Sequence, residues 1–112
     1  MDQVRFPIEF NNEIDDVKQS ENQLFTLAAD RLSKLAEGHK DISGAAVNLK
    51  QPAAGHVTPH IYEITVVVYM GADNIAATEK GEHIRAALDG ALDAVERQVR
   101  ERRVKARSYK TS

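Results

Sequence analysis

The sequence predicts an α+β domain of two layers: a four-stranded mixed sheet with two helices packed on one of its faces. Segments in which apolar residues alternate with a period of two, typical of half-buried strands, are combined with two segments of helical periodicity. Their order along the chain is β-α-β-β-β-α. Each helical segment carries a single apolar stripe, which suits a helix that packs on one sheet face.

The first half of the chain predicts two strands with a helix between them. Apolar and polar residues alternate from Val4 to Phe10, and Pro7 indicates an edge strand because proline cannot donate a ladder hydrogen bond. Asn11 to Gln19 has little periodicity and is interpreted as a link. A capping box at Ser20 begins a helix that continues to about Glu37, and Ile42 to Lys50 alternates again. The positions expected to be buried are Leu24, Leu27, Ala28, Leu32, Leu35, Ala45, Val47 and Leu49.

The second half predicts a hairpin and a final helix. Residues 51–60 contain two prolines and a glycine, which favours a loop. His60 to Met70 is rich in β-branched and aromatic residues, which indicates a central strand. A turn at 71–73 leads into a weaker strand from Asn74 to Thr78, and the apolar face of the last helix stops at Val99. The positions expected to be buried are Tyr62, Ile64, Val66, Val68, Met70, Ile84, Leu88, Ala91, Leu92, Val95 and Val99.

The connections predict how the strands pair. A strand-helix-strand unit favours a parallel first pair, whereas the short turn after Met70 favours an antiparallel pair. With both helices on one face, the face that bears Thr65, Val67 and Tyr69 stays open. A homodimer through this open face or through an edge strand is compatible with the pattern, and the sequence leaves its existence undecided.

Length and composition exclude several classes of protein. A chain of 112 residues suits one domain, and 42% hydrophobic with 29% charged residues is typical of a folded soluble protein. No apolar run reaches the ~20 residues of a membrane helix, and the start of the chain lacks the pattern of a secretory signal. We therefore expect a cytoplasmic protein with no membrane partner. The absence of cysteine excludes disulfides and thiolate chemistry.

Positive charge is concentrated at the C-terminal end. From Arg97 onward there are seven Lys or Arg against the single acid Glu101, which gives +6. Because the whole chain carries −2, residues 1–96 carry −8. We expect residues 1–99 to form a single α+β domain and residues 100–112 to form a basic helix end and tail. This asymmetry favours a binding protein with a polyanionic or acidic partner over an enzyme.

The last helix also carries the most specific motif. It contains AALDG at Ala86–Gly90, then Asp93, then RQV at Arg97–Val99. Two smaller motifs accompany it, RLSKL at Arg31–Leu35 and Val47-x-Leu49. In this pattern the chain resembles the short type of the ribosome hibernation-promoting factors, also called ribosome-associated inhibitors or sigma-54 modulation (S30EA-like) proteins. The resemblance implies a fold like that of double-stranded-RNA-binding domains.

The same resemblance implies a function without catalysis. Such a factor docks on the small ribosomal subunit near the decoding region, contacts ribosomal RNA and inhibits translation during stress or stationary phase by obstructing tRNA and mRNA. Basic side chains beside an RNA backbone gain affinity by releasing counterions. The residues carried over by position as ribosomal-RNA contacts are Arg31, Lys34, Arg97, Arg100, Arg103 and Lys105.

The acidic remainder of the chain supports an alternative. A divergent member of the same fold could be a protein-interaction module that binds an acidic protein partner, because the −8 of residues 1–96 repels RNA. A continuous positive strip from Arg31 and Lys34 to the tail favours RNA, and acids that interrupt it favour the alternative. The basic tail also has a structural interpretation, since Glu96 and Arg100 are spaced as an ordinary helical ion pair.

Other polar residues do not indicate a catalytic or metal site. Asp89 and Asp93 lie one turn apart, but each has an arginine four residues away, Arg85 or Arg97, which predicts a surface charge ladder. His56 and His60 lack a third ligand, and no enzyme motif such as GxSxG or a P-loop is present, so we expect no cofactor and no metal. Gly90 in the middle of a helix predicts a close contact there.

Overall fold

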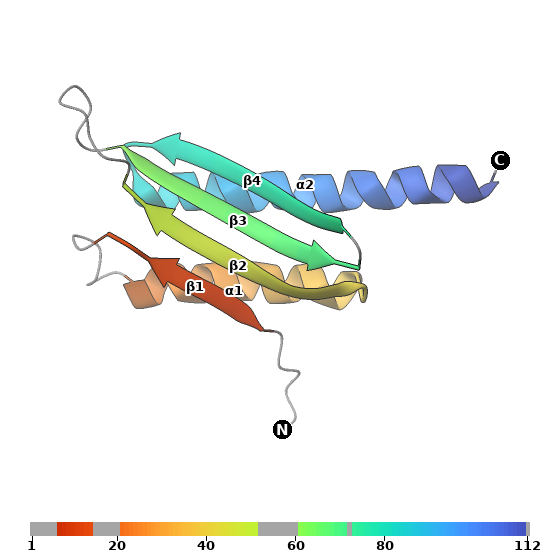
Figure 1. Cartoon of the computed structure of the whole chain (residues 1–112), viewed down its shortest axis with the longest axis horizontal. Helices are drawn as coiled ribbons and strands as arrows, with labels where there is room; N and C mark the ends of the chain where they lie inside the picture. The colour runs from red at the N-terminus through yellow and green to blue at the C-terminus, as the bar shows by residue number, and fades with distance from the viewer. Residues whose placement is uncertain (1–6, 15–20, 52–60, 72, 112) are drawn as a thin grey trace.

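The computed structural model describes residues 7–14, 21–51, 61–71 and 73–111, and for residues 103–111 it describes the backbone alone. The elements are β1 (Ile8–Asn12), α1 (Glu21–Gly38), β2 (Ile42–Lys50), β3 (Tyr62–Met70), β4 (Asp73–Gly81) and α2 (Ile84–Thr111). Figure 1 shows both helices on one face of the sheet, α1 behind β1 and β2, and α2 behind β3 and β4. The predicted α+β class and element order are confirmed.

The four strands form one sheet in the order β1-β2-β3-β4. β1 runs parallel to β2, and the other two pairs are antiparallel, as the connection lengths predict. Register places Val47 of β2 opposite Val66 of β3, and Val68 opposite Ile75 of β4. β1 lies at an edge of the sheet, as Pro7 predicted. The backbone carbonyl of Pro7 accepts a hydrogen bond from the amide of Ala45 at 3.1 Å.

The C-terminal ends of two strands differ most from the prediction. β1 ends at Asn12 rather than at Phe10, because ladder pairing with β2 continues through both asparagines and the Nδ2 of Asn11 donates to Oδ1 of Asn48 at 2.9 Å. β4 ends at Gly81 rather than at Thr78, because pairing with β3 extends through polar residues of low strand propensity. In both places tertiary pairing overrides local preference. Val4–Phe6 and the predicted cap Ser20 lie outside the described residues.

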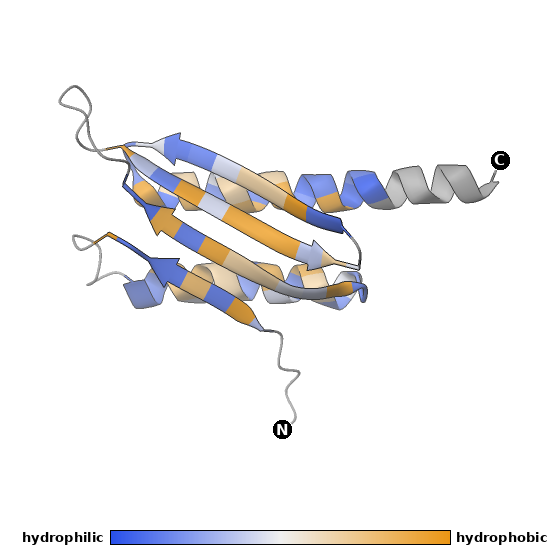
Figure 2. Cartoon of the chain, in the orientation of Figure 1, coloured by the Kyte–Doolittle hydropathy of each residue, from blue (hydrophilic) through white to orange (hydrophobic). Residues whose placement is uncertain are grey.

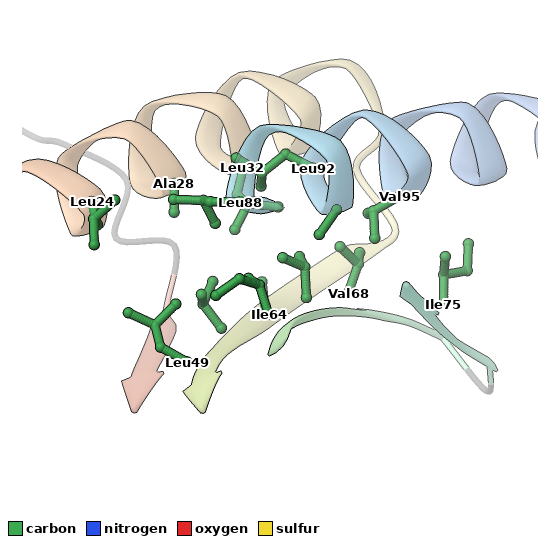
Figure 3. Close-up of a cluster of buried hydrophobic side chains, with 14 of the residues drawn as sticks. Leu24, Ala28, Leu32, Leu49, Ile64, Val68, Ile75, Leu88, Leu92 and Val95 are labelled. Carbon is green, nitrogen blue, oxygen red and sulfur yellow. The ribbon is translucent and has the colours of Figure 1, made fainter. Parts of the chain in front are cut away.

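The hydrophobic core fills the space between the sheet and the two helices (Figure 3). Nearly all positions predicted to be buried are confirmed, and the others, such as Leu27 and Tyr62, are partly buried against the same cluster. Ile14, in the predicted link, is 3% exposed and also joins the core. Each fully buried aliphatic side chain contributes about 1.5–3 kcal/mol, so the core determines how the two helices are held. In the described part of the chain, no helix has the length and apolarity needed to cross a membrane.

The sheet face away from the helices, called the open face below, carries alternate residues of every strand. It comprises the even positions 44–50 of β2 and 74–80 of β4, and the odd positions 63–69 of β3 and 9–11 of β1. Figure 2 shows the corresponding alternation of hydrophilic and hydrophobic residues along the strands. Tyr69, at 36% exposed, is the large aromatic residue on this face.

Candidate nucleic-acid interface

The basic end of α2 projects beyond the sheet. Val99 is the last buried residue among the described side chains of α2, while the helical backbone continues to Thr111 and passes the end of the β3-β4 hairpin (Figure 1). Arg97 and Arg100 are both exposed, and neither forms an ion pair with another described residue. Arg103 and Lys105 belong to the same helix, but their side chains lie outside the described part.

Two exposed side-chain contacts join this helix to β4. Nε2 of Gln98 donates to the backbone carbonyl of Ala76 on β4 at 3.3 Å. One turn later, Nη1 of Arg102 lies 2.9 Å from Oδ2 of Asp73 at the start of β4. Arg102 was not among the residues carried over by family position, and this contact depends on a fold that brings residues 29 positions apart together. Both contacts are exposed and contribute little to stability, so α2 is held mainly by its buried face.

Arg31 lies in a cluster of three carboxylates that joins α1 to α2. Its Nε donates to Oε2 of Glu96 at 2.9 Å and its Nη2 donates to Oδ1 of Asp93 at 2.5 Å. A third carboxylate, that of Asp89, has Oδ1 3.5 Å from Nη1 of Arg31. The three acids are spaced four and three residues apart on α2, so they share the side of the helix that faces α1. We call these four residues the Arg31 clamp.

The clamp has two electrostatic consequences. The hydrogen bond to Glu96 raises the pKa of the Arg31 guanidinium, with Asp93 adding to the effect and desolvation opposing it. One cation among three carboxylates leaves a formal charge of −2 at this junction, and this charge opposes the approach of a phosphate. The prediction that Asp89 and Asp93 pair with Arg85 and Arg97 is wrong, because both carboxylates pair across the helices with Arg31.

The other predicted contact on α1 is also beside an acid. Nζ of Lys34 lies 3.5 Å from Oδ2 of Asp30, with both side chains well exposed. Acids therefore interrupt any strip from Arg31 and Lys34 to the tail. On α2 the charge changes sign between Glu96 and Arg97, and Arg100 follows about one turn after Glu96. Because Glu96 is bonded to Arg31, the helical pair that its spacing to Arg100 suggests is not formed among the described side chains.

Gly90 lies in close contact with the Glu79 side chain of β4, and its place in the helix predicted such a contact. A Cβ added at this position would lie 3.2 Å from Cγ of Glu79. The AALDG motif thus combines core packing by Ala87 and Leu88, an acid of the clamp and a close contact at Gly90. No group of three or more His, Asp or Glu able to hold a metal is found within the described residues, and His56 and His60 lie outside them.

These features define a small α+β domain with a charged helix end, and comparisons with known proteins specify its family. The family model described as "Sigma 54 modulation protein / S30EA ribosomal protein" matches residues 19–107, so the chain belongs to this family. A comparison with curated proteins gives no match.

Two solved structures share the fold. One is a ribosomal subunit interface protein from Coxiella burnetii, with a TM-score of 0.66 and 13% identity, covering 88% of this chain and 99% of that one. The other is the N-terminal domain of Protein Y from Thermus thermophilus, with a TM-score of 0.61 and 18% identity, covering 88% of this chain and 98% of that one. At these identities the likeness concerns the fold.

Proposed function

We propose that this protein associates with the ribosome and binds the ribosomal RNA of the small subunit through the C-terminal part of α2. Family membership and the names of the two structural neighbours support a ribosomal role. The observation that carries the choice of surface is the pair of exposed arginines, Arg97 and Arg100, at the point where α2 leaves the sheet.

The physical basis of binding is the release of counterions. Arg and Lys that neutralise phosphates release the cations condensed on the RNA, so affinity falls steeply as salt increases. A structured RNA is met mainly through phosphates and shape, which suits a rigid basic helix better than a base-reading pocket. Arg103 and Lys105 extend the same helix and remain predicted contacts, while Arg31 and Lys34 are weaker candidates because each is already paired with acids.

The protein acts by occupancy rather than by chemistry in this proposal. Bound at the small subunit, it inhibits translation and promotes ribosome hibernation under stress or in stationary phase, in the cytoplasm. Its described residues need supply only charge and shape, so no catalytic group is assigned.

Co-sedimentation with small ribosomal subunits tests the proposal. Wild-type protein should pellet with the subunits at low salt and be released as salt is raised. Reversal of Arg97, Arg100 and Arg103 to Glu should abolish pelleting. The matched control is Arg85→Glu, which reverses an exposed arginine near the other end of the same helix and should leave pelleting unchanged. Absence of wild-type binding at low salt would remove the proposal.

The interruption of the positive strip by acids favours a second candidate, a protein-interaction module. Asp89, Asp93 and Glu96 surround Arg31 and Asp30 lies beside Lys34, so the helix layer outside the tail is unfavourable for RNA. In this function the basic end of α2 binds an acidic protein. A pull-down from nuclease-treated lysate separates the two: a partner that survives RNA removal supports the module, and loss of all ribosomal material on nuclease treatment supports RNA binding.

A further inference from the structure

The middle of the open face carries no basic residue. Its two central rows, which run across the strands through Val67 and Thr65, contain no lysine or arginine. A face that binds RNA needs cations, so these rows do not serve the proposed RNA contact. In the row through Thr65, the polar side chains bond to one another, Asn11 to Asn48 at 2.9 Å and Thr65 to Thr78 at 2.9 Å. Covering this row therefore leaves fewer polar groups without a partner.

Small side chains lie beside large ones on the open face, so a second surface can pack closely against it. Ala46 on β2 lies opposite Val67 on β3, and Ala76 on β4 lies on its other side. In the next row, a Cβ on Gly44 would lie 3.6 Å from Cδ2 of Tyr69, so the Tyr69 ring leans from β3 over β2. The largest side chain of the face is thus directed toward the line between the two central strands.

We propose that the open face is a homodimer interface, occupied by the open face of a second copy of this chain. The two-fold axis would run along the strands between β2 and β3, so that β2 of one copy covers β3 of the other. This operation places Val67 over the partner's Ala46, Lys50 over the partner's Glu63 and Asn48 over the partner's Thr65. Large side chains meet small ones and a base meets an acid, which is the self-complementarity that a two-fold interface requires. The two Tyr69 rings meet near the axis.

The size of the face suits a weak dimer. Three strands of nine residues and one of five, about 4.8 Å apart and about 3.3 Å long per residue, give each face roughly 510 Å². Two such faces cover about 1,000 Å² together, which just reaches the roughly 1,000 Å² expected of a biological interface. Sheets that stack in this way align within about 30° and sit about 10 Å apart. Because the helices lie on the far side of each sheet, dimerisation leaves α2 free and does not depend on what α2 binds.

Sedimentation-velocity ultracentrifugation of the full chain tests this interface. Wild-type protein should shift from monomer toward dimer with rising concentration between about 1 and 100 µM, the range of affinities that a small interface supports. Val67→Arg should abolish the shift. The matched control, Ala86→Arg, adds the same charge at an exposed site on α2 and should dimerise like wild type. Circular dichroism establishes that each variant is folded.

A charge exchange keeps the test valid if Val67→Arg fails to fold. Lys50→Glu and Glu63→Lys should each weaken the dimer at least tenfold, because each brings like charges together across the axis, and the double variant should restore it. A wild-type monomer at 100 µM, or a dimer that persists in folded Val67→Arg or in both single charge variants, overturns the proposal. The proposal is also overturned if the protein stays monomeric and its open face instead binds a different protein from a lysate, and if neither charge variant weakens that binding.

Discussion

Removing the Arg31 clamp should destabilise the fold more than removing any other cation of α1. In Arg31→Gln, Glu96 loses its partner in a sheltered position, with the Arg31 and Glu96 side chains only 25% and 22% exposed. A hydrogen bond to a charged group in such a site contributes about 1.5–3 kcal/mol. Asp93 and Asp89 are more exposed, at 66% and 44%, so their pairs add less. We expect a total loss of about 2–3 kcal/mol.

Thermal and urea unfolding followed by circular dichroism measure this loss. At this chain length each kcal/mol shifts Tm by about 4 °C, so Arg31→Gln should lower Tm by roughly 8–12 °C. Lys34→Gln is the matched control on the same helix, and its exposed pair with Asp30 should be worth less than about 1 kcal/mol. Equal effects of the two substitutions would refute the clamp.

The three carboxylates left without Arg31 provide a second readout. They repel one another across one side of α2, so adding Asp93→Asn to Arg31→Gln should recover part of the lost stability, whereas Asp93→Asn alone should destabilise. The opposite signs in the two backgrounds would not arise if Arg31 acted only through packing. If the double variant is less stable than Arg31→Gln, the electrostatic account is wrong.

Three further predictions concern packing and the helix end. Gly90→Ala should raise stability by up to about 1 kcal/mol, because helix propensity improves and the exposed Glu79 side chain can move aside. A lower urea midpoint would show that the Glu79 side chain cannot move aside. Leu92→Ala should cost about 2–5 kcal/mol in urea unfolding, since Leu92 is fully buried; a loss under 1 kcal/mol would contradict its core position. Asp73→Asn should change the free energy of unfolding by less than about 1 kcal/mol, because its pair with Arg102 is exposed. The same substitution frees Arg102 and should strengthen pelleting with ribosomes. Unchanged pelleting would show that Arg102 does not contact RNA.

The fold could be predicted because its determinants are periodic. The alternation in β3, the apolar stripe of α2 and the short turn at Gly71 each act locally, and the order of elements then limits the topology. The ends of β1 and β4 could not be predicted in the same way, because Asn12 and Lys80 are held in strands by their neighbours and not by their own propensity.

The candidate site was only partly predictable for a related reason. The concentration of charge after Arg97 is visible in the sequence, and α2 does present Arg97 and Arg100 to solvent. The state of Arg31 is not visible, since its partners are 62 and 65 residues away on another helix. Local spacing suggested pairs along α2, whereas the packing of α1 against α2 decides which charges meet. A basic residue that family resemblance assigns to RNA contact can therefore already be paired with acids within the protein.

The salt dependence of binding to small ribosomal subunits tests the central claim most directly. Each phosphate contact contributes about 0.7–0.9 to the slope of log affinity against log salt concentration. Arg97→Gln with Arg100→Gln should therefore reduce the slope by about 1.4–1.8, while Arg31→Gln, measured below its unfolding temperature, should leave the slope unchanged. A double variant with the slope of wild type would contradict the assignment of RNA binding to the projecting end of α2.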